Sequence, residues 1–217
     1  MNSTKAIIFD MDGVLVDSEP FHVEIEKRMF KKMGLNITDE EHAGYMGIAT
    51  DVMWAQIIKK RKLQWDVNEM TQLTINESKP FFNSLEKIEP MTGIKDLLNK
   101  ITEWKIPIAV ASSSDPETIR IILQKSGLEK YFSHAISSLE VGKSKPEPDV
   151  FIHAAKLLGA KPENCLVIED SKNGIKAAKA AGMYCVAYSG LAAENQDQSQ
   201  ADLVIDDYSS LEKLLVE

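Results

Sequence analysis

Two aspartates, Asp10 and Asp12, flank one methionine directly after the apolar run AIIF, and Gly13 follows them. A carboxylate with a pKa of about 4 is ionised at neutral pH and can attack as a nucleophile. A second carboxyl group with a raised pKa can give a proton to a leaving group. Gly13 permits a sharp turn that would direct Asp12 towards that group. The spacing therefore predicts that Asp10 attacks and that Asp12 transfers the proton.

Polar residues also follow three other predicted strands. The run IPIAVA ends in Ser112-Ser113-Ser114, and the run CLVI ends in Glu169-Asp170-Ser171. The segment VGKSKPEPD, with Lys143 and Lys145, comes after a strand near Ala135. In open parallel sheets, ligands bind outside the carboxyl ends of the strands. We therefore expect all four clusters to share one edge of the sheet.

Carboxylates that converge in this way repel one another unless a cation lies among them. Mg²⁺ is the most plausible cation, because it prefers oxygen ligands and is bound through one or two carboxylates together with water and phosphate oxygens. A lysine and a serine are not needed for a metal alone, but they supply the fixed charge and the hydroxyl donors that a phosphate group requires. The combination predicts phosphoryl transfer.

Short apolar runs alternate with segments of helical period over most of the chain. The predicted strands are Ala6–Phe9, Ile106–Ala111, His134–Ser137, Cys165–Ile168, Met183–Ala187 and Leu203–Ile205. Alternation of this kind is typical of βαβ units. The sequence therefore predicts an α/β fold, with a Rossmann-like parallel sheet covered by helices on both faces.

One interval breaks the alternation, because several helical patterns and no convincing strand occur between the first predicted strand and the second. Phe21, Ile25, Met29 and Met33 form one apolar stripe at helical spacing. We interpret residues 16–86 as a small helical cap domain inserted after the first strand. Residues 1–15 and 87–217 would then form the α/β catalytic core.

The composition limits the partners of the protein. The 217 residues carry a formal net charge of −8, which argues against a nucleic-acid or anionic-membrane surface. No uncharged apolar stretch approaches the ~18 residues of a membrane span. Cys165 and Cys185 lie in apolar runs and are expected to be buried reduced thiols. We expect a cytoplasmic monomer whose partner is a small phosphorylated metabolite.

The segments DMDGVLVDS, ASSS, GKSKPEPD and VIEDSKNG resemble, in order and spacing, the four motifs of the haloacid dehalogenase superfamily. The subgroup that the chain most resembles contains the β-phosphoglucomutase-like sugar phosphatases and mutases. The resemblance covers nearly the whole chain. It implies a Mg²⁺-dependent phosphatase that acts on a sugar or polyol phosphate through an aspartyl-phosphate intermediate.

The resemblance also implies a role for each motif residue. Asp10 would be the nucleophile and Asp12 the general acid/base, and Lys145 would neutralise the phosphoryl group. Ser112 would bind phosphate through its hydroxyl group, with Ser113 beside it. The site residues that the resemblance implies for the metal are Asp10, Asp12 through its main-chain carbonyl, Asp170, and Glu169 either directly or through water.

A phosphomutase of the β-phosphoglucomutase type is the alternative function. Such mutases resemble this chain in the same motifs but carry a lysine after the second motif and an arginine in a cap loop, whereas this chain has Asp115 and Thr50 there. Both departures weaken the mutase interpretation, because a second phosphate would lack its cations. His22 matches a histidine of the mutases, but related phosphatases also carry one, so it remains a candidate substrate-binding residue for either function.

A signalling receiver domain is a second alternative, because receivers also place acidic residues, a hydroxyl and a lysine at a parallel sheet edge. The helical insertion and Asp12, which makes turnover possible, both oppose it. A dinucleotide-binding domain is disfavoured because no Gly-x-Gly-x-x-Gly follows the first strand.

Overall fold

The computed structural model describes residues 4–45, 48–190 and 196–216. The chain divides into two compact units. Residues Met1–Asp17 and Lys87–Glu217 form the first, which we call the α/β unit. Residues Ser18–Glu86 form the second, which we call the helical unit.

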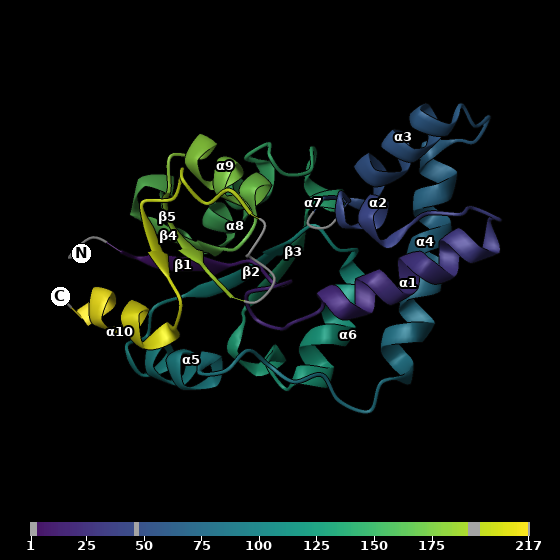
Figure 1. The fold of residues 1–217 in the computed structure, drawn as a ribbon. Coiled ribbons are helices and arrows are strands. Elements are labelled where there is room, and N and C mark those ends of the chain that lie inside the picture. The colour runs from purple at the N-terminus through teal and green to yellow at the C-terminus, as the bar shows by residue number, and fades with distance from the viewer. Residues whose placement is uncertain (1–3, 46–47, 191–195, 217) are drawn as a thin grey trace. The chain divides into compact units, whose positions relative to one another are not determined.

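The α/β unit is built on a six-stranded sheet with the order β3-β2-β1-β4-β5-β6, in which every pair of neighbours is parallel (Figure 1). The strands are β1 (Ala6–Phe9), β2 (Ile108–Ser112), β3 (His134–Ser137), β4 (Cys165–Glu169), β5 (Tyr184–Tyr188) and β6 (Leu203–Ile205). The predicted α/β fold class is confirmed.

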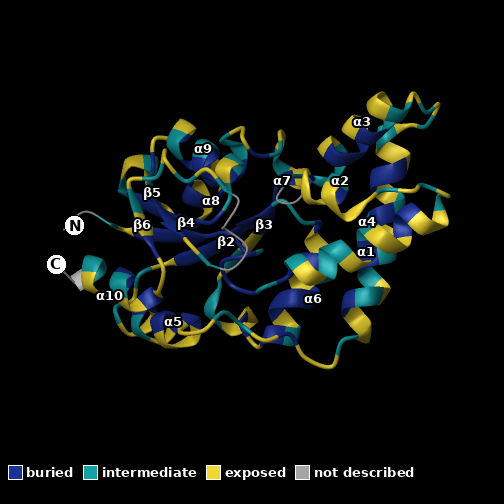
Figure 2. Ribbon diagram, in the orientation of Figure 1, coloured by how far each residue is buried: buried dark blue, intermediate teal, exposed yellow. Residues whose placement is uncertain are grey.

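Helices cover both faces of this sheet (Figure 1). They are α5 (Ile94–Glu103), α6 (Pro116–Ser126), α7 (Ser138–Val141), α8 (Asp149–Leu157), α9 (Lys172–Ala180) and α10 (Tyr208–Val216), with 3₁₀ turns η1 (Glu129–Tyr131) and η2 (Pro162–Asn164). Each longer helix has buried residues along one side and exposed residues along the opposite side (Figure 2). The central strands β1, β2 and β4 are buried throughout, as expected for parallel strands covered on both faces.

Three of the predicted strands have the observed bounds, and the other three differ at their ends. The second strand begins at Ile108 instead of Ile106, after Pro107, which has no N–H group to donate. β2, β4 and β5 each end one residue later than predicted, at Ser112, Glu169 and Tyr188, and β5 begins at Tyr184 instead of Met183. The sheet therefore reaches into the polar cluster at its edge.

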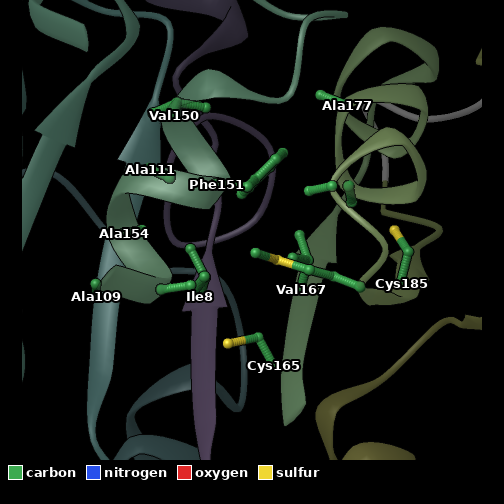
Figure 3. Close-up of a cluster of buried hydrophobic side chains, with 14 of the residues drawn as sticks. Ile8, Ala109, Ala111, Val150, Phe151, Ala154, Cys165, Val167, Ala177 and Cys185 are labelled. Carbon is green, nitrogen blue, oxygen red and sulfur yellow. The ribbon is translucent and has the colours of Figure 1, made fainter. Parts of the chain in front are cut away.

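The core on one face of the sheet packs α8 and α9 against alternate strand residues (Figure 3). Ile8 and Val167 come from the two central strands, and Phe151 comes from α8. Small residues such as Ala154 and Ala177 allow the two helices to approach the sheet closely.

The helical unit contains α1 (Glu19–Lys32), α2 (Asp39–Ala43), α3 (Thr50–Arg61) and α4 (Val67–Ser84). Its own core surrounds Trp54, which is fully buried and donates a hydrogen bond from its indole nitrogen to the Thr74 hydroxyl at 2.9 Å. No strand occurs in the described part of this unit. Across the described residues of the chain, no helix is long and apolar enough to cross a membrane.

Two neighbouring residues of α8 test this account of the core. Phe151 is fully buried, whereas Ile152 is 46% exposed. Phe151→Ala should lower the free energy of unfolding by about 3–5 kcal/mol, because it opens a cavity against the sheet. Ile152→Ala, the matched control, should change it by less than about 0.5 kcal/mol. Urea unfolding followed by circular dichroism measures both, and equal effects would contradict the packing described here.

Candidate active site

The carboxyl ends of neighbouring strands bring the predicted residues together at one edge of the sheet. Asp10 directly follows β1, Ser112 ends β2, and Glu169 ends β4. β1 lies between β2 and β4 in the sheet, so the three ends are adjacent. Lys145 reaches the same place from the loop between α7 and α8, which follows β3.

Lys145 is the centre of the cluster. Its Nζ donates hydrogen bonds to Asp10 Oδ1 at 2.5 Å, to Glu169 Oε1 at 2.7 Å and to the Ala111 carbonyl at 3.1 Å. It also lies 4.9 Å from the centre of the Phe151 ring. The lysine is 7% exposed, so its charge is balanced by protein groups and not by water. All three donors of the ammonium group are therefore used, and its position is fixed.

Glu169 is held from both sides. Its Oε1 accepts from Lys145, and its Oε2 accepts from the backbone N–H groups of Asp170 and Ser171, each at 2.8 Å, and from the Ser171 hydroxyl at 3.0 Å. Ser171 also begins α9, because its hydroxyl accepts from the Gly174 N–H. The start of the helix and the orientation of Glu169 therefore depend on the same serine.

The Asp170 carboxylate differs from that of Glu169, because no described residue donates a hydrogen bond to it. The same holds for Oδ2 of Asp10. Asp10, Glu169 and Asp170 each offer an oxygen, and the three atoms lie within 4.8 Å of one another. Buried carboxylate oxygens without donors fit a hard divalent cation.

The charge balance leads to the same conclusion. Burial raises the pKa of Asp10 to about 8, since the opposing effect of Lys145 is partly cancelled by Glu169 and Asp12. Burial, and then the charges of Glu169 and Asp10, raise the pKa of Asp170 well above its ordinary value. Burial disfavours the charged form of Lys145, but the two adjacent carboxylates outweigh it and raise its pKa. One ammonium group does not compensate this many carboxylates, so the donor set fits a metal.

Asp12 turns away from this cluster and towards the end of β2. Its Oδ2 accepts hydrogen bonds from the hydroxyl groups of Ser112 at 3.2 Å and Ser114 at 3.1 Å. Its carboxylate is not one of the three that lie together. This separation agrees with a role for the Asp12 side chain in proton transfer and not in metal binding.

Two glycines make room for the carboxylates. Gly13 has a φ of +79°, and a Cβ on it would lie 2.2 Å from Asp170 Oδ2. A Cβ on Gly174, in the first turn of α9, would lie 1.6 Å from Glu169 Oε1. Both positions therefore require glycine because a carboxylate fills the space beside them.

Ser113 and His22 are the two other residues that were predicted to bind substrate or phosphate. Ser113 is half-buried, and no described residue forms a hydrogen bond with its hydroxyl group. His22 belongs to α1 of the helical unit, where its ring lies 5.5 Å from that of Phe82. Lys143 is exposed, whereas Lys145 is buried in the cluster. The roles of Ser113 and His22 stay predictions.

Sequence reasoning missed three contributors to the site. From the sequence, no role is assigned to Ser114 or Ser171, yet the hydroxyl of each donates a hydrogen bond to a carboxylate of the site. Gly174 gives a signal that could have been used, because a glycine within a predicted helix often has a packing reason. The sequence gives no such signal for Ser114, because it does not show which of three consecutive serines faces the site.

Comparison with known proteins agrees with this geometry. The chain is 31% identical over 179 residues to a phosphorylated carbohydrates phosphatase of Thermotoga maritima, which covers 82% of each chain. It is 28% identical over 212 residues to a β-phosphoglucomutase of Bacillus subtilis, covering 95% of this chain and 91% of the other. CbbY from Rhodobacter sphaeroides, solved with xylulose-1,5-bisphosphate, shares the fold with a TM-score of 0.85, 24% identity and 96% coverage of both chains.

The sequence model of the haloacid dehalogenase-like hydrolases matches residues 7–188. That interval contains all four strand ends and every carboxylate of the cluster, so the resemblance predicted from the motifs is confirmed. The chain belongs to the haloacid dehalogenase-like hydrolase family.

Proposed function

We propose that the protein is a Mg²⁺-dependent phosphatase that hydrolyses a small phosphorylated metabolite, a sugar or polyol phosphate, with Asp10 as the nucleophile. The observation that supports it most is the buried cluster in which Lys145 contacts both Asp10 and Glu169, with Asp170 beside them. A relative that is named a phosphorylated carbohydrates phosphatase supports the substrate class.

Asp10 and Asp170 would hold the metal, with the Asp12 main-chain carbonyl and with Glu169 directly or through water. Mg²⁺ at this position would supply positive charge that offsets the carboxylates and the phosphoryl oxygens. Glu169 has a further role in this proposal, because its hydrogen bonds hold Lys145 and the Asp170 backbone in place.

The reaction would run in two steps on this chain's residues. Asp10 attacks the phosphorus atom, the bond from phosphorus to the leaving oxygen breaks, and Asp12 gives that oxygen a proton. Water then attacks the aspartyl phosphate and gives its proton to Asp12, which releases phosphate and restores Asp10. Lys145 would stabilise the negative charge of the phosphoryl group throughout, and Ser112 would donate a hydrogen bond to it.

The helical unit would act as the cap that selects the substrate and excludes bulk water during the first step. This role rests on the position of residues 18–86 between the first two strands of the sequence. His22 on α1 would contact the substrate from this unit. The two free, buried cysteines are consistent with a reducing compartment, and we propose that the protein acts in the cytoplasm.

A phosphomutase remains the second candidate, because one relative is named a β-phosphoglucomutase. Asp115 weighs against it. Its carboxylate accepts from the backbone N–H groups of Glu117 and Thr118 and begins α6. A helix N-terminus can bind a phosphate, but here an acidic side chain already occupies it. A receiver domain is not supported, since the family is one of hydrolases.

A panel of sugar and polyol phosphates, offered with Mg²⁺, tests the proposal. We expect free phosphate to be released from some members, and Asp10→Asn to reduce the rate by about ten-thousandfold or more, because the nucleophile is lost. Asp96→Asn, on the exposed face of α5, is the matched control and should keep wild-type activity. Isomerised sugar phosphate without matching phosphate release would make the protein a mutase, and full activity of Asp10→Asn would refute the assigned nucleophile.

Metal binding can be tested without turnover. Mg²⁺ at about 100 times its Kd should stabilise the protein by about 2.7 kcal/mol, which raises Tm by about 5–10 °C for a chain of this size. Asp170→Asn should lose most of this response, yet its metal-free form should be at least as stable as the wild type because one buried like charge is gone. An unchanged response in Asp170→Asn, measured by calorimetry beside Asp96→Asn, would contradict the metal site.

A further inference from the structure

Ser114 makes a contact that the proposed reaction does not use. Its hydroxyl donates to Asp12 Oδ2 at 3.1 Å, the same oxygen that the Ser112 hydroxyl reaches at 3.2 Å. Ser114 lies in the turn between β2 and α6, outside the helix. Two serines from one turn therefore hold one oxygen of the residue that we assign to proton transfer.

The turn that carries Ser114 is fixed on several sides. The Ser114 N–H donates to Ser112 Oγ at 3.0 Å, and the Ser137 hydroxyl donates to the Ser114 carbonyl at 2.7 Å. The Ser138 hydroxyl donates to the Ser112 carbonyl at 3.2 Å. The turn is thus tied to the end of β3, so the direction of the Ser114 side chain is set by its backbone.

Ser112 and Ser114 donate their hydroxyl protons to different groups once substrate binds. A serine hydroxyl has one proton to donate. In the proposed function, Ser112 gives that proton to the phosphoryl group, so it can no longer give it to Asp12. The proposed reaction does not use the Ser114 hydroxyl, so it can keep donating to Asp12 Oδ2.

We propose that Ser114 is a positioning residue that holds the Asp12 carboxyl group through the catalytic cycle, so that Oδ1 carries the transferred proton. The proposal rests on the proposed function, since it needs Asp12 as the general acid. Oδ2 can accept from Ser114 whether Oδ1 is protonated or not. The hydroxyl of Ser114 therefore fixes the carboxyl group in both steps without taking part in the transfer.

Removing a residue that positions the general acid should lower kcat/KM most for substrates whose leaving group must be protonated. Phenyl phosphate and p-nitrophenyl phosphate have nearly the same shape, but nitrophenolate leaves without protonation, whereas phenolate is a much stronger base. The value of kcat/KM reports events up to the first irreversible step, which is the departure of this group. A comparison of the two esters therefore isolates the acid from binding and from the later attack of water.

Ser114→Ala should lower kcat/KM for phenyl phosphate by about fivefold, the effect of one hydrogen bond, and change it by less than about twofold for p-nitrophenyl phosphate. Asp12→Asn should show the same pattern with a loss of about a hundredfold or more on phenyl phosphate. Ser114→Thr keeps the hydroxyl group and should restore the phenyl phosphate rate.

Ser126→Ala is the matched control, because among the described residues the Ser126 hydroxyl bonds only to the Leu123 carbonyl, at the other end of α6. It should leave both rates unchanged. Equal losses on both esters in Ser114→Ala, or no loss on either, would overturn the positioning role while leaving the phosphatase intact. If the wild type releases phosphate from neither ester nor from any sugar or polyol phosphate, the proposed function itself fails.

Discussion

The ion cluster around Lys145 is the constraint on which the rest of the site depends. A single buried ammonium group joins the end of β1 to the end of β4 through Asp10 and Glu169. Removing charges from water is costly unless they are paired and hydrogen-bonded, and this lysine uses all three donors. Asp170 and the second oxygen of Asp10 accept no hydrogen bond from the described residues, and in the proposed function these oxygens hold the cation.

The surrounding chain is arranged to keep those charges close. Glycine at positions 13 and 174 leaves the space that the carboxylates of Asp170 and Glu169 fill. Ser171 begins α9 and orients Glu169 at once. Asp12 is kept apart from the cluster by the serine turn after β2. One edge of the sheet thus separates the residues suited to charge stabilisation from the one suited to proton transfer.

The fold and the cluster could largely be predicted from the sequence, because both follow from local patterns. Apolar runs marked the strands to within two residues, and a parallel sheet necessarily places their ends together, which brought Asp10, Lys145 and Glu169 into contact. Side-chain direction is not a local property. Whether Ser112, Ser113 or Ser114 faces Asp12 depends on the turn that Ser137 and Ser138 tie down from another strand. In the proposed function, substrate selection also depends on how residues 18–86 meet the substrate, which no spacing encodes.

The central claim is that Asp10 becomes phosphorylated. The most direct measurement mixes the protein and Mg²⁺ with a ³²P-labelled sugar phosphate from the active panel, quenches with acid within milliseconds, and maps the labelled peptide. The account predicts label on the peptide that contains Asp10, lost in Asp10→Asn and longer-lived in Asp12→Asn, because the attack of water then lacks its base. Rapid phosphate release with no label on the protein, or label on another residue, would contradict it.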